Sequence, residues 1–207
     1  GVVKNLALSC YITNYSDIEP IIDILKSLST KILEDCSPDE IKKFTKILLN
    51  GDWLFVTNDP KVIFNKIKLL RRKSIINIYT SITWDIYNNI IEIYSDSGRA
   101  VRPLYILDNN KFRISRKYID NLEQKKISWT HLLCGSLNND NNFNDIPKIK
   151  ECVIEYLDVQ EENNCMIAIN DDKLKSLDNK VIRYKYTHCE IHPSLQTGVL
   201  ASIIPFS

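Results

Sequence analysis

Hydrophobic side chains in the first third of the chain recur at intervals of three and four residues, which is the spacing of a helix face. One helix is expected to follow Asp17, a residue type that caps helices, with Pro20 in its first turn. Its apolar face is Ile18, Ile21, Ile22, Leu25 and Leu28. A further helix is expected over about residues 60 to 73. Its apolar face is Ile63, Ile67 and Leu70.

Between these two lies a sharper helix start. Ser37 is a favoured N-cap, Pro38 suits the first helical position, and Glu40 stands where it can close a capping box. The dipeptide Asn50-Gly51 is expected to end this helix. Its predicted apolar stripe is Ile41, Phe44, Ile47 and Leu48.

Runs of β-branched, aromatic and aliphatic residues predict strands farther along the chain. They cover residues 52–56, 75–84, 90–94 and 99–107. The turn-forming residues 95–98 are expected to close a hairpin between the last two of these strands. Because proline has no N–H to donate, Pro103 predicts an edge strand or a bulge.

The last third of the chain adds two shorter apolar runs, residues 152–157 and 165–169, around the acidic residues 158–162, and this pattern predicts another hairpin. The Asn-rich residues 138–144 predict a surface loop. Residues 198–206 are largely apolar, which would leave an exposed patch and indicates a missing partner or missing chain. Together the patterns predict an α+β fold of mixed small α/β modules, with β-hairpins and with three helices in the N-terminal third.

Composition narrows the chemistry. The formal net charge of the 207 residues is +1, so any contact with nucleic acid has to come from a local patch. Lys61, Lys68 and Arg72 line up on one side of the helix expected at 60 to 73. Two interpretations stay open for them: a solvated basic face, which is the commoner arrangement, or a face that contacts phosphates.

The six cysteines have no closely spaced pairs, so neither a disulfide framework nor a zinc site is expected, and no metal ligand is assigned. The acidic residues 158–162 could hold a divalent cation but more often form a solvated turn. His188, Glu190 and His192 could do acid–base work or simply hydrogen-bond within a packed site. The sequence has no Walker loop and no nucleophile elbow, and we assign no catalytic residue.

Several stretches, in the same order along the chain, resemble the second-largest, beta-type subunit of multisubunit DNA-dependent RNA polymerases. They are residues 1–8 (GVVKNLAL), 50–53 (NGDW), 69–73 (LLRRK), 96–104 (DSGRAVRPL), 153–158 (VIEYLD) leading into 161–162 (EE), 166–169 (MIAI), 186–194 (YTHCEIHPS) and 201–206 (ASIIPF). The sequence departs from the family pattern at Val159-Gln160, Gln196-Thr197 and Ser207. The interrupted acidic stretch argues against a demanding metal role there.

The resemblance implies an internal fragment with four parts: the end of the fork region (1–49), the external 1 domain (50–112), the external 2 domain (113–182) and the start of the hybrid-binding region (183–207). It implies a part in templated RNA synthesis from ribonucleoside triphosphates, as a scaffold that joins the fork to the hybrid-binding region. The expected partners are other polymerase subunits, chiefly the largest, with the DNA template and the RNA–DNA hybrid, and no membrane. Magnesium would be held by the largest subunit, none would be bound here, and the fragment alone would be inactive.

By position in the family, Lys4, Asn5, Glu190, His192 and Ser194 resemble residues near the hybrid. Lys4 and Asn5 could equally fix the backbone of the fork. Arg99 and Arg102, which lie in an outer domain, are expected to form structural ion pairs.

Two other interpretations are a separate assembly module that docks on a polymerase and an unrelated nucleic-acid-binding domain that uses the helix at 60 to 73. The rich use of Ile, Asn and Lys favours an AT-rich genome, such as that of a large DNA virus. An intracellular location is expected, in the nucleus or cytoplasm, or in a virion and a cytoplasmic factory for a virus.

Overall fold

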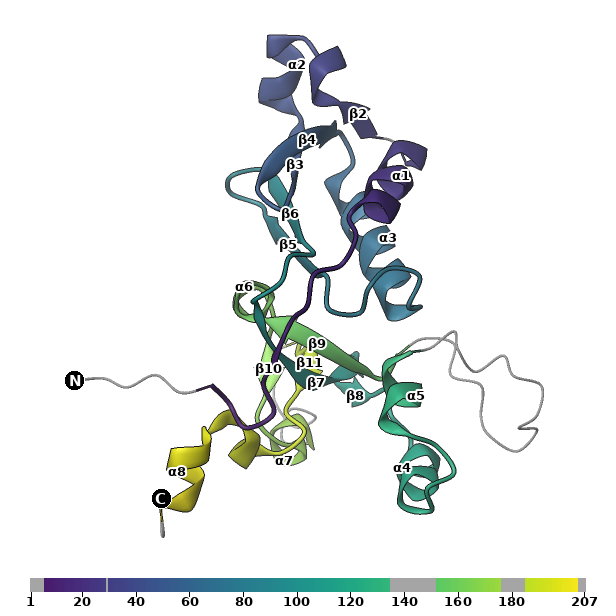
Figure 1. Cartoon of the computed structure of the whole chain (residues 1–207), viewed down its shortest axis with the longest axis vertical. Helices are drawn as coiled ribbons and strands as arrows, with labels where there is room; N and C mark the ends of the chain where they lie inside the picture. Colours follow the sequence, from purple (N-terminus) through teal and green to yellow (C-terminus); the bar gives the residue numbers. More distant parts are fainter. Residues whose placement is uncertain (1–5, 29, 135–151, 176–184, 205–207) are drawn as a thin grey trace.

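The chain builds two β-sheets that follow one another along its long axis, as the computed structural model shows (Figure 1). The structure describes residues 6–28, 30–134, 152–175 and 185–204. The first described residues lie beside the second sheet; the chain then crosses to build the first sheet and returns at residues 95–99 to complete the second. The second of these connections contributes Asp96 and Arg99 to the site described below.

The first sheet has five strands and is built from consecutive parts of the chain. In spatial order they are β2 (Thr30–Ile32), β4 (Asp52–Thr57), β3 (Thr45–Leu49), β6 (Ile90–Tyr94) and β5 (Ser81–Asp85). Helices α1 (Glu19–Ser27) and α3 (Pro60–Arg72) cover one face (Figure 1). Between them and the sheet lies a core that includes Leu25, Ile47, Ile67 and Ile91. The short η1 (Leu33–Asp35) and α2 (Pro38–Lys43) follow β2.

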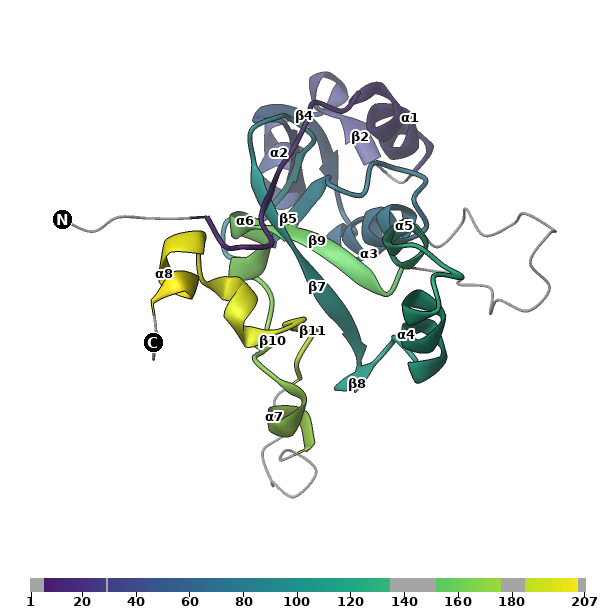
Figure 2. The same ribbon diagram turned by 60° about the horizontal axis from the view of Figure 1, so that its bottom comes forward.

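The second sheet is organised around β7 (Ala100–Asp108). The strands that pair with it are β1 (Tyr11–Ile12), β8 (Lys111–Phe112), β9 (Ile154–Asp158) and β11 (His188–Cys189), and β10 (Ile167–Ala168) pairs with β11. The helices of this half are α4 (Arg116–Glu123), α5 (Trp129–Leu133), α6 (Val159–Asn163), α7 (Asp171–Lys175), η3 (Pro193–Gln196) and α8 (Val199–Ile203). Figure 2 shows α8 next to the first described residues, and Leu8 donates a hydrogen bond of 2.9 Å to the carbonyl of Thr197.

The α+β fold class is confirmed, as are the three helices of the N-terminal third. The N-cap of α1 is Ile18, so Asp17 lies one residue ahead of the cap position that was expected for it. The side chain of Asp17 accepts a hydrogen bond of 3.1 Å from the N–H of Glu19. The capping box of Ser37 and Glu40 is present at the start of α2.

The predicted length of the second helix was wrong. α2 ends at Lys43, and Thr45–Leu49 form β3, so Phe44, Ile47 and Leu48 are not a helical stripe. The buried residues of β3 alternate, which is the strand period, and β3 pairs with both β4 and β6. Asn50-Gly51 is the turn of the β3–β4 hairpin, with φ of 50° and 93°. Positive φ at both central residues is what the tight hairpin turn favoured by Asn-Gly requires.

The hairpin predicted at residues 95–98 was also wrong. β6 belongs to the first sheet and β7 to the second, so residues 95–98 carry the chain from one sheet to the other. β6 instead pairs with β5, which begins at Ser81, not at residue 75. The hairpin predicted around residues 158–162 does not form either, because β9 pairs with β7, β10 pairs with β11, and the acidic residues form α6.

Pro103 lies in a central strand, contrary to the edge or bulge that was predicted. Along β7, Ile106 donates its N–H toward the β9 side and Leu107 donates toward the β11 side, so the missing N–H of Pro103 faces the second of these sides. There β1 pairs only with residues 100–101 and β11 only with residues 105–106. The proline therefore occupies a gap in the ladder where no donor is needed.

The proposed division at residue 50 falls inside the β3–β4 hairpin, and the four-part division of the chain stays a prediction. The loop expected at 138–144 lies outside the described residues. The apolar C-terminal stretch is exposed where the structure describes it, at Val199, Leu200, Ile203 and Ile204. No described helix has the length and apolarity needed to cross a membrane.

Candidate functional site between the two sheets

A buried arginine lies where the last turn of α3 meets the second sheet. The side chain of Arg71 is 1% exposed. Its guanidinium donates to Glu155 of β9 through Nε at 3.1 Å, and to the two carboxylate oxygens of Glu161 of α6 at 2.6 and 2.7 Å. It also donates to the carbonyl of Thr80 at 2.6 Å. A single guanidinium thus holds together α3, β9, α6 and the segment before β5.

Neighbouring side chains complete this ionic network, which consists of Lys68, Arg71, Arg72, Glu155, Glu161 and His188. Arg72 contacts Glu155 at 2.9 Å, and Lys68 contacts Glu161 at 3.2 Å. His188 of β11 lies with Nε2 3.1 Å from Glu155. The N–H of Glu161 donates to the carboxylate of Asp158, the N-cap of α6, at 2.9 Å, which fixes the first turn of that helix.

A second set of ion pairs surrounds the start of β7. Arg99 contacts Asp96 at 2.8 Å and Asp158 at 3.3 Å, and donates to the carbonyl of Tyr79 at 2.9 Å. Arg102 contacts Glu162, and it also contacts Glu190 at 2.6 Å. The structural ion pairs predicted for Arg99 and Arg102 are confirmed.

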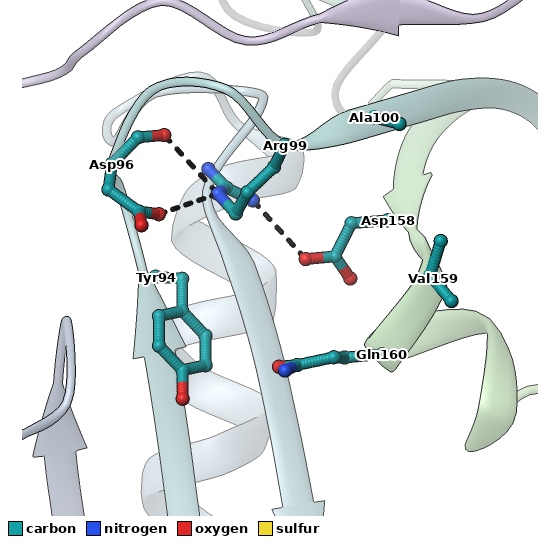
Figure 3. Close-up of a pocket in the computed structure, with 7 residues that line it drawn as sticks. All are labelled: Tyr94, Asp96, Arg99, Ala100, Asp158, Val159 and Gln160. Carbon is teal, nitrogen blue, oxygen red and sulfur yellow. Dashed lines mark hydrogen bonds and ion pairs between the residues drawn. The ribbon is translucent and has the colours of Figure 1, made fainter. Parts of the chain in front are cut away.

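Arg99 also lines a pocket of about 310 Å³ (Figure 3). The other lining residues are Tyr94, Asp96, Ala100, Asp158, Val159 and Gln160. In Figure 3 the guanidinium of Arg99 lies between the carboxylates of Asp96 and Asp158, so its charge is already matched.

The cations control the ionisation of the buried carboxylates. Burial by itself opposes ionisation of Glu155, but the charges of Arg71 and Arg72 outweigh it and hold the pKa of Glu155 well below its usual range. Burial opposes ionisation of Glu161 in the same way, yet Arg71 and Lys68 lower its pKa. Both groups are therefore carboxylates at neutral pH, and the network is ionic.

The lowered pKa values make the fold sensitive to acid. A carboxyl group whose pKa is lower in the folded state contributes stability above its unfolded pKa, about 4.3 for Glu, and loses it as pH falls through the folded pKa. We expect the thermal midpoint to fall as pH is lowered from 7 to 3 at constant ionic strength, and Glu161→Gln to flatten this dependence. A matched change at the exposed Glu34, Glu34→Gln, is the control. A wild-type midpoint that does not change over this range would contradict the expectation.

The residues singled out from the sequence fall in different places. Lys68 and Arg72 belong to the ionic network, whereas Lys61 is exposed on α3. Lys68 and Arg72 form ion pairs with internal carboxylates. The expectation that all three residues share a solvated or phosphate-contacting face therefore needs correction. Lys4 and Asn5 lie outside the described residues.

Glu190, His192 and Ser194 are brought together around η3. Glu190 is buried and paired with Arg102, and Gln196 donates to it at 2.8 Å. His192 is exposed, and its Nδ1 accepts the N–H of Ser194 at 3.2 Å. His188, considered for acid–base work, is buried against Glu155 instead. Proximity to nucleic acid stays a prediction for Glu190, His192 and Ser194.

The acidic residues 158–162 are not a solvated turn, because Asp158 and Glu161 are buried and Arg99, Arg71 and Arg102 pair with this stretch. Within the part of the chain that the structure describes, no three His, Cys, Asp or Glu side chains are placed together as metal ligands.

Sequence reasoning missed Arg71, Glu155 and Glu161. One sign was available: Arg71 stands four residues after Ile67, so it continues the buried face of α3. Glu155 is likewise a lone acid within an apolar run. An ionisable residue at a core position is buried only with a partner. Neither the buried face of α3 nor the apolar run around Glu155 identifies that partner.

The chain is similar to known protein families. Residues 47–108 match the family model "RNA polymerase Rpb2, domain 4", and residues 148–193 match "RNA polymerase Rpb2, domain 5". The two models follow one another in the chain, and both describe domains of Rpb2-type RNA polymerase subunits.

The relatives specify which subunit. A "DNA-directed RNA polymerase II subunit 2" of Arabidopsis thaliana is 38% identical over 213 residues, and a "DNA-directed RNA polymerase II subunit RPB2" of Encephalitozoon cuniculi is 36% identical over 208 residues. A "DNA-directed RNA polymerase subunit 2" of Acanthamoeba polyphaga mimivirus is 29% identical over 231 residues. The alignments with the first two cover 100% of this chain and 17% of each relative. The chain belongs to the family of second-largest, Rpb2-type RNA polymerase subunits, and it spans about one sixth of their length.

Proposed function

We propose that this chain serves as a scaffold within a DNA-directed RNA polymerase, an enzyme that joins ribonucleoside triphosphates into RNA on a DNA template. The observation that carries the proposal is the match along the whole chain to second-largest subunits. In this proposal residues 1–49 end the fork region, 50–112 and 113–182 form the external 1 and external 2 domains, and 183–207 begin the hybrid-binding region.

The described ionisable residues support a structural role. Lys68, Arg71 and Arg72 face internal carboxylates, and Arg102 faces Glu162 and Glu190. A cation that already has a buried carboxylate partner is poorly placed to hold a phosphate. This pairing also argues against the alternative in which α3 binds nucleic acid through Lys68 and Arg72.

Magnesium does not fit the described residues. The buried carboxylates Glu155, Glu161 and Glu190 all accept hydrogen bonds from arginines, and no three-ligand cluster occurs among the residues that the structure describes. We propose, as the resemblance to polymerase subunits implies, that ligands on the largest subunit hold the magnesium of the whole enzyme, and that residues outside those described carry the nucleotide chemistry. The location of the chain would be that of its polymerase, in the nucleus or cytoplasm, or in the virion and cytoplasmic factory for a virus.

A purification tests the proposal. With an affinity tag on the full natural polypeptide that contains this sequence, we expect the largest polymerase subunit to copurify, and the eluate to incorporate ribonucleotides only when a DNA template is present. The tagged 207-residue chain alone should show no incorporation. Recovery of the natural polypeptide as a monomer without any polymerase subunit would refute the proposal and favour an unrelated role.

A further inference from the structure

A groove runs between the first sheet and α6. Its first part is the pocket of Figure 3, and its second part is a cavity of about 480 Å³ beside the β5–β6 hairpin. Gln160 lines both, so the two cavities adjoin. On the sheet side, Thr83 of β5 stands opposite Glu92 of β6, on the face away from α1 and α3. Together the two cavities have the size of a site that holds several side chains.

The groove is negatively charged. Asp85 and Glu92 line its second part, and neither has a Lys or Arg partner within the ranges that the structure describes. In the first part, the charge of Arg99 is matched by Asp96 and Asp158. A segment that brings positive charge would therefore find unmatched carboxylates, whereas the phosphates of a nucleic acid would be repelled.

A second feature, independent of the charge, indicates a protein partner. At the tip of the β5–β6 hairpin, Tyr87 is 99% exposed and Ile86 is 65% exposed, and Val159 on the α6 side is 65% exposed. The backbone of the tip is stabilised, because the carboxylate of Asp85 accepts the N–H groups of Tyr87 at 2.9 Å and Asn88 at 3.1 Å. Tyrosine contributes large contact area at small entropic cost, and it is enriched among residues that dominate protein interfaces.

We propose that this groove binds an extended, basic segment of a protein partner. In the complex, Lys or Arg side chains of the segment face Asp85 and Glu92, and an apolar side chain packs against Tyr87 and Ile86 at the hairpin tip.

Photo-crosslinking tests the proposal in the full natural polypeptide, purified with whatever binds it. A benzophenone amino acid replaces Tyr87 in one sample and Val62, which is 63% exposed on α3, in another. We expect efficient crosslinking from position 87 to a protein segment that contains Lys or Arg, identified by mass spectrometry, and little crosslinking from position 62.

Gln160 supplies a matched pair of variants, because it is exposed and lines both cavities. Gln160→Lys places a positive charge in the groove and is expected to lower the yield from position 87 about tenfold, while Gln160→Glu should not lower it. Equal yields in the two variants, crosslinks to RNA or DNA, a crosslinked segment without Lys or Arg, or a yield at position 87 no higher than at position 62 would each overturn the proposal. Because the readout is the chemistry of the segment, failure of the polymerase assignment would appear separately, as a partner that is not a polymerase subunit.

Discussion

Replacing Arg71 by methionine is expected to lower the free energy of unfolding by about 3 to 5 kcal/mol, the range found when one partner of a buried ion pair is removed. Methionine fills much of the same space but leaves Glu155 and Glu161 buried with less positive charge around them. Arg72 still contacts Glu155 and Lys68 still contacts Glu161, so the carboxylates are not wholly without cations. The loss should therefore lie within this range rather than above it.

Urea unfolding followed by circular dichroism measures the Arg71 effect, and Arg116→Met is the control, because Arg116 is exposed on α4. Arg71→Lys should recover only part of the loss, since an ammonium group cannot reproduce bonds to Glu155, Glu161 and the Thr80 carbonyl in one plane. If the free energy of unfolding of Arg71→Met is within about 1 kcal/mol of that of the parent chain, the network does not stabilise the fold in the way described.

Replacing Ile67 by alanine is expected to cost about 2 to 5 kcal/mol, the usual range for truncating a buried isoleucine. Ile67 is 1% exposed and packs in the core between α3 and the first sheet. The loss combines the transfer of fewer carbons from water with the cavity left behind. Urea unfolding again gives the magnitude.

Val62 on the same helix provides the comparison for Ile67, because it is 63% exposed. Val62→Ala should change the free energy of unfolding by no more than about 0.5 kcal/mol. Similar losses for Val62→Ala and Ile67→Ala would mean that α3 does not bury the face assigned to it.

The sequence predicted elements whose causes are local. The positions of α1 and α3 follow from residues close together in the chain, and the capping box of Ser37 and Glu40 was identified for the same reason. The extent of α2 was not local. Residues 45–49 form a strand that pairs with β4 on one side and β6 on the other. The pairing of Lys46 with Ile90 joins residues that are far apart in the sequence, so the local sequence pattern does not reveal it.

The site was less predictable than the fold for the same reason. Arg71 meets Glu155 and Glu161 across sequence separations of 84 and 90 residues. The resemblance to polymerase subunits located the family but not this contact. The basic face predicted from α3 contained the right residue types, yet Lys68 and Arg72 find their carboxylates on elements whose position depends on β7.

The order of the strands has a consequence for the nascent chain. The first sheet uses only residues 30–94, so it can form as soon as that stretch has left the ribosome. The second sheet joins residue 11 to residues as late as 189, so it cannot close until residue 189 has been synthesised. During that interval Arg71 is already part of α3, but Glu155 and Glu161 have not yet been synthesised. The guanidinium of Arg71 therefore stays hydrated until these two residues leave the ribosome.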